Sequence, residues 1–334
     1  MSGGFAIEVE GLVKRYGEKV ALDGVGFEVP RGTVCGLLGP NGAGKTTAVR
    51  IMTTLSEPDA GRAVVGGVDV LADPAGVRRL IGLAAQDATV DGLLTGRENL
   101  QMIGELHHIG RGTAKARAAE LLDQFSLSDA ADRQAKTYSG GMRRRLDLAA
   151  TLVARPEVLF LDEPTTGLDP RARNELWDVL ETLVGQGTTI MLTTQYLEEA
   201  DRLADDIVVI DHGTVIARGN ALELKRQVGG AQVFVTVADP ARIADVVAHV
   251  GRLADAEPGI DVPTRLVQAP TEGGPRVVSR LADALADAGI EVEDIGLRQP
   301  TLDDVFLTLT GAPIAEDEDE DEGDRTPEPV EVAR

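Results

Sequence analysis

The sequence predicts an α/β fold built on a mainly parallel sheet. Three short apolar runs, at residues 33–38, 158–161 and 188–193, have the length and composition of buried strands. Predicted helices lie between them, and such alternation of strands and helices is typical of a parallel sheet. The length of 334 residues allows two domains, or three small ones.

The elements of the first half follow from local patterns. Residues 5–29 alternate between apolar and polar side chains around turn signals, which predicts antiparallel strands. A glycine-rich segment follows the strand at 33–38 and leads into a helix that ends near residue 55. Residues 90–154 are expected to be mostly helical, with interruptions at glycines and at residues 138–141.

In the second half, a helix is predicted to begin at Pro170, because proline lacks only an N–H group that is unpaired at a helix start anyway. A hairpin is predicted at residues 206–218. Beyond residues 229–230 the pattern predicts a small α/β module with strands at 232–237, 265–268 and 291–297, helices at 241–253 and 277–288, and a last helix at 302–309.

These patterns divide the chain into three parts. Residues 1–228 form the first domain, and residues 229–312 form an accessory α/β domain. Residues 313–334 form an acidic tail that is expected to be disordered, because it has too little apolar surface to offset the entropy of ordering. A solubilising role is the favoured interpretation of the tail, and a docking role is the alternative.

The charge balance excludes some functions. The formal net charge is −22, of which residues 316–334 contribute −8 through ten acidic and two basic side chains. A body that remains acidic argues against a general nucleic-acid-binding protein, which needs a basic face. It also argues against attachment to anionic lipid by charge alone.

Cysteine and histidine content excludes other classes. The single cysteine, Cys35, rules out an internal disulfide framework and a multi-cysteine zinc site. His107 and His108 are interpreted as residues of a solvated helix rather than metal ligands. The N-terminal segment has no features of a signal peptide, and no apolar run approaches a membrane span, so a cytoplasmic location is expected.

The strongest motif is GPNGAGKT at residues 39–46, which matches G-x-x-x-x-G-K-[ST] between a predicted strand and a predicted helix. Glycines let the backbone surround a phosphate with N–H groups, and the following helix points its positive end at the same anion. Lys45 would reach the β- and γ-phosphates, and Thr46 would hold Mg²⁺. This motif alone does not distinguish kinases, GTPases, helicases and transport ATPases.

A second motif places two carboxylates at the tip of a strand. The apolar run at 158–161 ends in Asp162 and Glu163. Asp162 is positioned to bind in the magnesium shell, and Glu163 is suited to polarise an attacking water.

The third motif is Ser139-Gly140-Gly141 at a predicted helix start, where N–H groups and one hydroxyl can bind an anion. Three arginines, 143–145, follow it. They are interpreted as charges on the solvated side of the helix rather than as a nucleic-acid patch.

Together, in this order, the motifs resemble the ATP-binding subunits of ABC transporters over about residues 5–225: GPNGAGKTT (39–47), Gln86, SGG (139–141), LFLDEP (159–164) and Gly167-Leu168-Asp169. Further segments resemble the subgroup that confers daunorubicin and doxorubicin resistance: LLTGRENL (93–100), YSGGMRRRLDLA (138–149), TTQYLEEAD (193–201) and LRQPTLDDVFLTLTG (297–311).

The resemblance implies a P-loop (RecA-like) ATP-binding domain with antiparallel β and helical subdomains, and it assigns residue roles. Tyr16 would stack on adenine, and Gln86 would sense Mg²⁺ and contact the membrane partner. Ser139, Gly140 and Gly141 would bind the γ-phosphate held by the opposite subunit, and Asp169 would link the two sites. The residues implied to hold the phosphates are Gly39, Pro40, Asn41, Gly42, Ala43, Gly44, Lys45, Thr46 and Thr47.

By the same resemblance, Thr46, Gln86 and Asp162 would serve the magnesium ion, and Lys45, Glu163 and Gln195 would serve catalysis. Two positions depart from the common family pattern, although the subgroup shares both. Met142 stands where the family usually has glutamine. Gln195 stands where it usually has a switch histidine, and an amide can donate a hydrogen bond but cannot carry a proton charge.

The implied function is ATP hydrolysis that drives a membrane exporter. Two copies would enclose two ATP·Mg²⁺, and a separately encoded permease would bind the cargo and hold the subunits at the cytoplasmic face of the membrane. No nucleic-acid partner is expected. An anthracycline-type drug is the cargo implied by the subgroup, while lipid or polyketide cargo remains open. A non-transport ABC ATPase and a P-loop phosphotransferase are the alternative classes.

Removal of the acidic tail tests its interpretation as a solubiliser. A chain that ends at Ala315 is expected to keep nearly unchanged ATPase and efflux activity, because residues 316–334 have almost no apolar side chains that could support ordered docking. Both activities would be measured beside the full chain. Loss of efflux on tail deletion alone would instead assign the tail a docking role.

Overall fold

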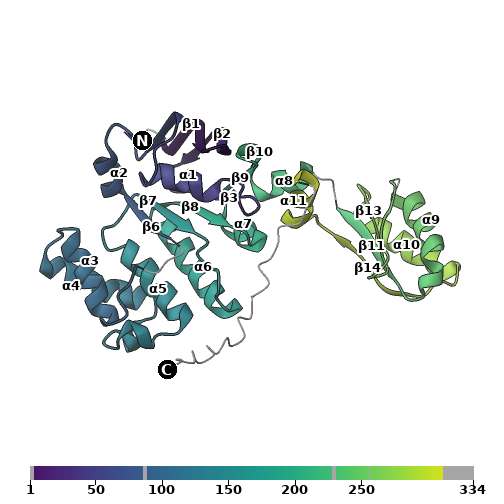
Figure 1. Ribbon diagram of the computed structural model, residues 1–334. Helices are drawn as coiled ribbons and strands as arrows, with labels where there is room; N and C mark the ends of the chain where they lie inside the picture. Colours follow the sequence, from purple (N-terminus) through teal and green to yellow (C-terminus); the bar gives the residue numbers. More distant parts are fainter. Residues whose placement is uncertain (1–3, 86–88, 228–230, 255, 311–334) are drawn as a thin grey trace, which may run out of the picture.

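The computed structural model describes residues 4–85, 89–227, 231–254 and 256–310. Two sheets form the first part of the chain, and a third sheet forms a separate module at the C-terminal side (Figure 1). The α/β fold predicted from the sequence is confirmed.

The central sheet has six strands in the order β10-β9-β3-β8-β7-β6. Neighbours from β9 to β6 pair in parallel, and β10 pairs antiparallel with β9. Every residue of the three strands predicted as buried is buried, because both faces of the sheet are covered, one by helices and the other by a second sheet and a helix. The strands are β3 (Val34–Leu38), β6 (Ile81–Ala84), β7 (Val158–Asp162), β8 (Thr189–Thr194), β9 (Asp206–Asp211) and β10 (Thr214–Gly219).

A four-stranded antiparallel sheet lies beside it, in the order β2-β1-β4-β5. Its long hairpin, β1 (Phe5–Tyr16) and β2 (Lys19–Pro30), confirms the antiparallel prediction for residues 5–29. Residues 56–84 carried no prediction, and they form short elements: β4 (Ala60–Val65), β5 (Val68–Asp69), α2 (Pro74–Leu80) and β6. Helix α1 (Lys45–Met52) packs in the core between the two sheets.

Helices form a layer on the other side of the central sheet (Figure 1). Thr95 begins this layer with a capping box in which it exchanges hydrogen bonds with Glu98. Its helices are α3 (Gly96–Leu106), α4 (Arg111–Gln124), the 3₁₀ turns η1 (Ser128–Ala130) and η2 (Ala135–Thr137), α5 (Gly140–Thr151) and α6 (Pro170–Gly185). His107 and His108 are exposed in the turn that follows α3.

The C-terminal module has the chain order β-α-β-β-α-β and the sheet order β12-β13-β11-β14, a split β-α-β arrangement. Its core is formed by alternate residues of the strands and one face of each helix. The elements are β11 (Gln232–Val237), η3 (Pro240–Arg242), α9 (Ile243–Ala254), β12 (Gly259–Asp261), β13 (Leu266–Pro270), α10 (Pro275–Asp287) and β14 (Val292–Arg298).

The last helix, α11 (Leu302–Thr310), leaves this module and returns to the first part of the chain, beside α7 (Leu197–Leu203) and α8 (Ala221–Gln227) (Figure 1). Leu302, Val305 and Phe306 are buried in one cluster with residues of β3, β9, α7 and α8. The predicted boundary at residues 228–229 lies at the edge of the described residues, and the three-part division remains a prediction.

In the portion of the chain that the structure describes, no helix combines the length and the apolar character needed to cross a bilayer.

The packing of α11 predicts that alanine substitutions at two adjacent positions lower the free energy of unfolding by very different amounts. Phe306 is 2% exposed and Leu307 is 48% exposed. Phe306→Ala is expected to lower the free energy of unfolding by about 3–5 kcal/mol through loss of burial and creation of a cavity. Leu307→Ala, the control, should change it by no more than about 0.5 kcal/mol. Urea denaturation of both variants measures the difference, and equal effects would show that α11 does not pack as described.

Candidate active site

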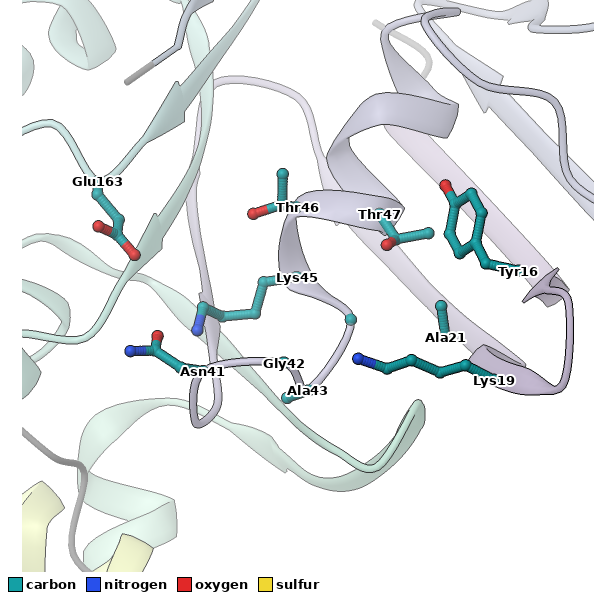
Figure 2. A pocket seen from close by; sticks show the side chains of 11 residues that line it. Tyr16, Lys19, Ala21, Asn41, Gly42, Ala43, Lys45, Thr46, Thr47 and Glu163 are labelled. Carbon is teal, nitrogen blue, oxygen red and sulfur yellow. The ribbon is translucent and has the colours of Figure 1, made fainter. Parts of the chain in front are cut away.

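A pocket of about 340 Å³ opens between the antiparallel sheet and the tips of the central strands (Figure 2). It unites the glycine-rich loop after β3, the first turn of α1, the β1–β2 hairpin and the turn after β7. The residues that line it are Tyr16, Lys19, Ala21, Asn41, Gly42, Ala43, Gly44, Lys45, Thr46, Thr47 and Glu163.

The loop after β3 is packed so closely that two of its glycines cannot be replaced without a clash. A Cβ at Gly39 would lie 2.2 Å from the carbonyl oxygen of Ile210 in β9. A Cβ at Gly44 would lie 2.5 Å from the carbonyl oxygen of Ala21 in β2, and its φ of +113° also disfavours side chains. The glycines of the motif therefore let the loop pack closely against both sheets, and they also leave its backbone N–H groups accessible to a ligand.

Lys45 is the buried cation of the pocket. Its side chain reaches back to the loop, and Nζ donates to the carbonyl oxygens of Gly39 at 2.7 Å and Pro40 at 3.2 Å. Only 6% of the residue is exposed. Burial lowers the pKa of Lys45, while the nearby Glu163 and Asp162 raise it. The ammonium group is thus fixed where a bound anion would neutralise it.

Asp162 lies at the end of β7 and is buried. Its Oδ1 accepts a hydrogen bond from the hydroxyl of Thr193 on the neighbouring strand β8. Thr193 was missed by sequence reasoning, because a threonine inside an apolar strand carries no signal of its partner. This bond fixes the orientation of the Asp162 carboxylate.

Glu163 follows directly and enters the pocket with a left-handed backbone, at φ +47°. Non-glycine residues rarely adopt this conformation, and where they do the surrounding structure has to enforce it. Its N–H donates to the carbonyl oxygen of Thr193 at 3.1 Å, and its Oε2 accepts from Thr166 at 3.4 Å. Figure 2 shows Glu163 on the same side of the pocket as Lys45, with Tyr16 at the opposite end.

Tyr16 forms that opposite end from the tip of β1. It is 50% exposed, and the ammonium of Lys14 lies 5.5 Å from its ring centroid. Lys19 and Ala21 complete this side of the pocket and were not predicted. A planar aromatic face beside a cationic rim can stack a heteroaromatic ring while the loop binds its phosphates.

Ser139, Gly140, Gly141 and Asp169 do not line this pocket. Ser139 and Asp169 are the N-caps of α5 and α6: Ser139 accepts from the N–H of Met142 at 3.3 Å, and Asp169 accepts from that of Ala172 at 2.8 Å. A Cβ at Gly141 would lie 3.3 Å from the Ala172 side chain, so the two helix starts are adjacent. Both caps are exposed.

Two predicted residues remain. Gln195 is buried directly after β8, at the same sheet edge as Asp162, and is not among the residues that line the pocket. Gln86 lies outside the described residues.

The interpretation of residues 143–145 as a solvated arginine face is wrong for two of them. Only Arg143 is exposed. Arg145 donates to the carbonyl oxygen of Phe125 at 3.2 Å, and Arg144 donates to carbonyl oxygens around Asp162 and Glu163. Arg144 and Arg145 lie on the side of α5 that packs against the rest of the protein. Three consecutive arginines in a sequence do not show which of them will lie on that side.

Comparison with known proteins agrees with this geometry. The chain matches the ABC transporter family model over residues 22–166. It is 57% identical to a daunorubicin resistance ATP-binding protein of Streptomyces coeruleorubidus, over 92% of this chain and 96% of that protein. It is 38% identical to a Nod factor export ATP-binding protein of Ralstonia nicotianae, over 91% of this chain and 94% of that protein.

Solved structures agree as well. The chain resembles the ATP-binding subunit of an ABC transporter with a TM-score of 0.61 and 28% identity, over 66% of this chain and 92% of that one. It resembles an ATP-binding cassette of an ABC transporter in its ADP conformation with a TM-score of 0.60 and 27% identity. The match covers 66% of this chain and 92% of that one.

The bond between Thr193 and Asp162 predicts a specific loss of stability. Thr193→Val keeps the shape of the side chain but leaves a buried carboxylate without this donor, so the free energy of unfolding should fall by about 1–3 kcal/mol. Thr193→Ser retains the hydroxyl and serves as the control. Chemical denaturation compares the two. A valine variant as stable as the serine variant would show that the bond is not formed.

Proposed function

The chain belongs to the ABC transporter family as an ATP-hydrolysing subunit, and from this premise we propose that two copies power export of a drug-like compound through a separately encoded permease. The observation that carries the proposal is the convergence of the glycine-rich loop, Lys45 and Glu163 on one pocket. That pocket holds a cation where phosphates would bind and a carboxylate where water would be activated.

In this proposal ATP lies along the pocket with its adenine on Tyr16 and its phosphates in the loop. The phosphates then approach the N–H groups at the start of α1 and the Lys45 ammonium, which is already oriented by two carbonyl oxygens. Binding therefore offsets the cost of burying this charge.

Magnesium fits the oxygen ligands at the same place. The Thr46 hydroxyl is exposed in the pocket, and the Asp162 carboxylate is held nearby by Thr193. Hydroxyl and carboxylate oxygens are ligands that Mg²⁺ prefers beside phosphates. Thr46, Asp162 and Gln86 would hold the ion, which neutralises phosphate charge when bound.

Each residue of the site would have its own role in hydrolysis. The Glu163 carboxylate accepts a proton from a water whose oxygen attacks the γ-phosphorus, and the bond from that phosphorus to the β,γ-bridging oxygen breaks. Lys45 stabilises the negative charge that shifts toward the leaving ADP. Gln195, directly after the C-terminal end of β8, would donate a hydrogen bond to the γ-phosphate.

We propose that each pocket is completed by a second copy of the chain. Ser139 and Gly140 are exposed at the N-terminus of the 12-residue helix α5, yet neither lines the pocket of its own chain. A helix N-terminus with free N–H groups is suited to an anion. The γ-phosphate bound by a facing copy supplies that anion, and Asp169, adjacent to this helix start, would connect the two pockets.

The cargo and the location follow from the relatives. Proteins named for daunorubicin resistance share 55–57% identity with this chain, which supports an anthracycline-type cargo. The similarity to Nod factor export proteins, at 38%, keeps other cargo, such as lipids or polyketides, open. The permease would bind the cargo and hold the subunit at the cytoplasmic face of the membrane.

The C-terminal module, residues 229–312, is proposed to stabilise or regulate the dimer, and residues 313–334 to form a disordered acidic tail with a solubilising role. Support comes from α11, since Phe306 and Thr310 line a cavity of about 450 Å³ that also includes Lys19 and residues 41–43 of the phosphate loop. The module is thereby connected to the wall of the nucleotide pocket.

Two substitutions separate binding from hydrolysis. Lys45→Ala removes the charge at the β- and γ-phosphates, so it should abolish productive ATP binding. Glu163→Gln keeps binding but cannot accept the proton, so ATP should trap it as a dimer. Sedimentation at saturating ATP measures the trapped dimer. A Glu163→Gln chain that remains monomeric would contradict the two-copy arrangement.

Gln195 can be tested by its pH dependence. Gln195→Ala should reduce hydrolysis strongly while ATP binding survives. Gln195→His should keep activity and gain a titration between about pH 6 and 8, with activity falling as pH rises and the imidazolium loses its charge-assisted bond. The wild type should lack this step. The measurement is kcat against pH for all three chains, and full activity of the alanine variant would remove Gln195 from the mechanism.

A further inference from the structure

Arg144 gathers four backbone carbonyl groups around one guanidinium. Nε donates to Pro164 O at 2.9 Å, and Nη2 donates to Asp162 O at 3.1 Å and Glu163 O at 3.2 Å. Nη1 donates to Ala85 O at 2.8 Å. The side chain is 14% exposed, and the planar fork of arginine suits donation in several fixed directions.

Asp147 accompanies Arg144 one turn later on α5. The Asp147 side chain is fully buried, and its Oδ2 lies 3.7 Å from Arg144 Nη1. Its Oδ1 accepts from Thr89, at 2.7 Å from the backbone N–H and 2.5 Å from the hydroxyl. The pair therefore contacts Ala85 and Thr89, the described residues on either side of residues 86–88.

Arg144 binds the turn at residues 162–164, whose backbone conformation needs contacts to maintain it. Asp162, Glu163 and Pro164 direct three successive carbonyl oxygens to the same guanidinium, and Glu163 between them has φ +47°. A left-handed conformation at a bulky residue persists only where surrounding contacts enforce it. Without the guanidinium, these carbonyl groups would lose their hydrogen bonds to a charged donor, and the buried Asp147 carboxylate would lose the cation that lies 3.7 Å from its Oδ2.

We propose that Arg144 and Asp147 act as one positioning pair that joins helix α5, Ala85, Thr89 and the turn that carries Glu163 into a single unit. The pair sets the position of the Glu163 carboxylate for hydrolysis without touching the nucleotide. This inference rests on the proposed role of Glu163 as the base.

The pair predicts a loss in kcat with little change in KM. Arg144→Gln should lower the kcat for Mg·ATP hydrolysis by the full chain about tenfold or more, while KM and ATP binding stay within about twofold, because the interaction serves the transition state. Arg144→Lys should recover part of the loss, since it keeps the charge but not the fork. Arg143→Gln, exposed on the same helix, is the matched control and should match the wild type.

A double-mutant cycle tests whether the two residues act together. Asp147→Asn alone should also lower kcat, and Arg144→Gln combined with Asp147→Asn should lose no more than the worse single variant. Losses that multiply would contradict a single unit. Normal kcat in a folded Arg144→Gln chain, or a lower melting temperature with unchanged kcat, would reduce Arg144 to a structural residue.

Two further outcomes are also decisive. If Arg144→Gln fails to fold, Arg144→Lys and Asp147→Asn decide the matter, and normal kcat in both would overturn the proposal. If the wild type and Arg143→Gln both fail to hydrolyse ATP, the proposed function itself is refuted, and the role of the pair with it.

Discussion

The burial of Lys45, with its ammonium held against a backbone loop, is the constraint on which the site depends. A cation in this position needs oxygen partners, and Gly39 and Pro40 supply them from the loop itself. The loop can approach that closely because Gly39 and Gly44 lie against carbonyl groups of β9 and β2. The two sheets therefore define the shape of the loop and the position of the Lys45 ammonium within it.

The turn that carries Glu163 is held by hydrogen bonds rather than by close packing. Thr193 orients Asp162, and the carbonyl groups of the turn that carries Glu163 converge on Arg144. Glu163, the proposed base, thus has a left-handed backbone beside carbonyl groups that accept from Arg144 on α5, and the same helix has Ser139 at its exposed start. In the proposed dimer, this helix would link phosphate contact in a facing copy to water activation in its own chain.

Much of this could be predicted from the sequence because it is encoded locally. Glycine spacing defines the phosphate loop, an apolar run ending in Asp162 and Glu163 defines a strand tip, and alternation defines the β1–β2 hairpin. The roles of Arg144 and α11 were not predictable in this way. Three consecutive arginines look alike until α5 is packed, and the apolar positions of α11 show that one face is buried but not that it returns to β3 and α7.

In the proposed dimer, each ATP site combines the loop of one chain with the α5 N-terminus of another. A mixture of two chains that both carry Glu163→Gln tests this arrangement: one also carries Lys45→Ala and the other Gly141→Asp. If sites form across chains, neither chain alone should dimerise with ATP, but the mixed dimer keeps one intact site and should retain one ATP. If loop and α5 of the same chain formed the site, both sites in the mixture would be defective and no ATP would be retained, which would contradict the account.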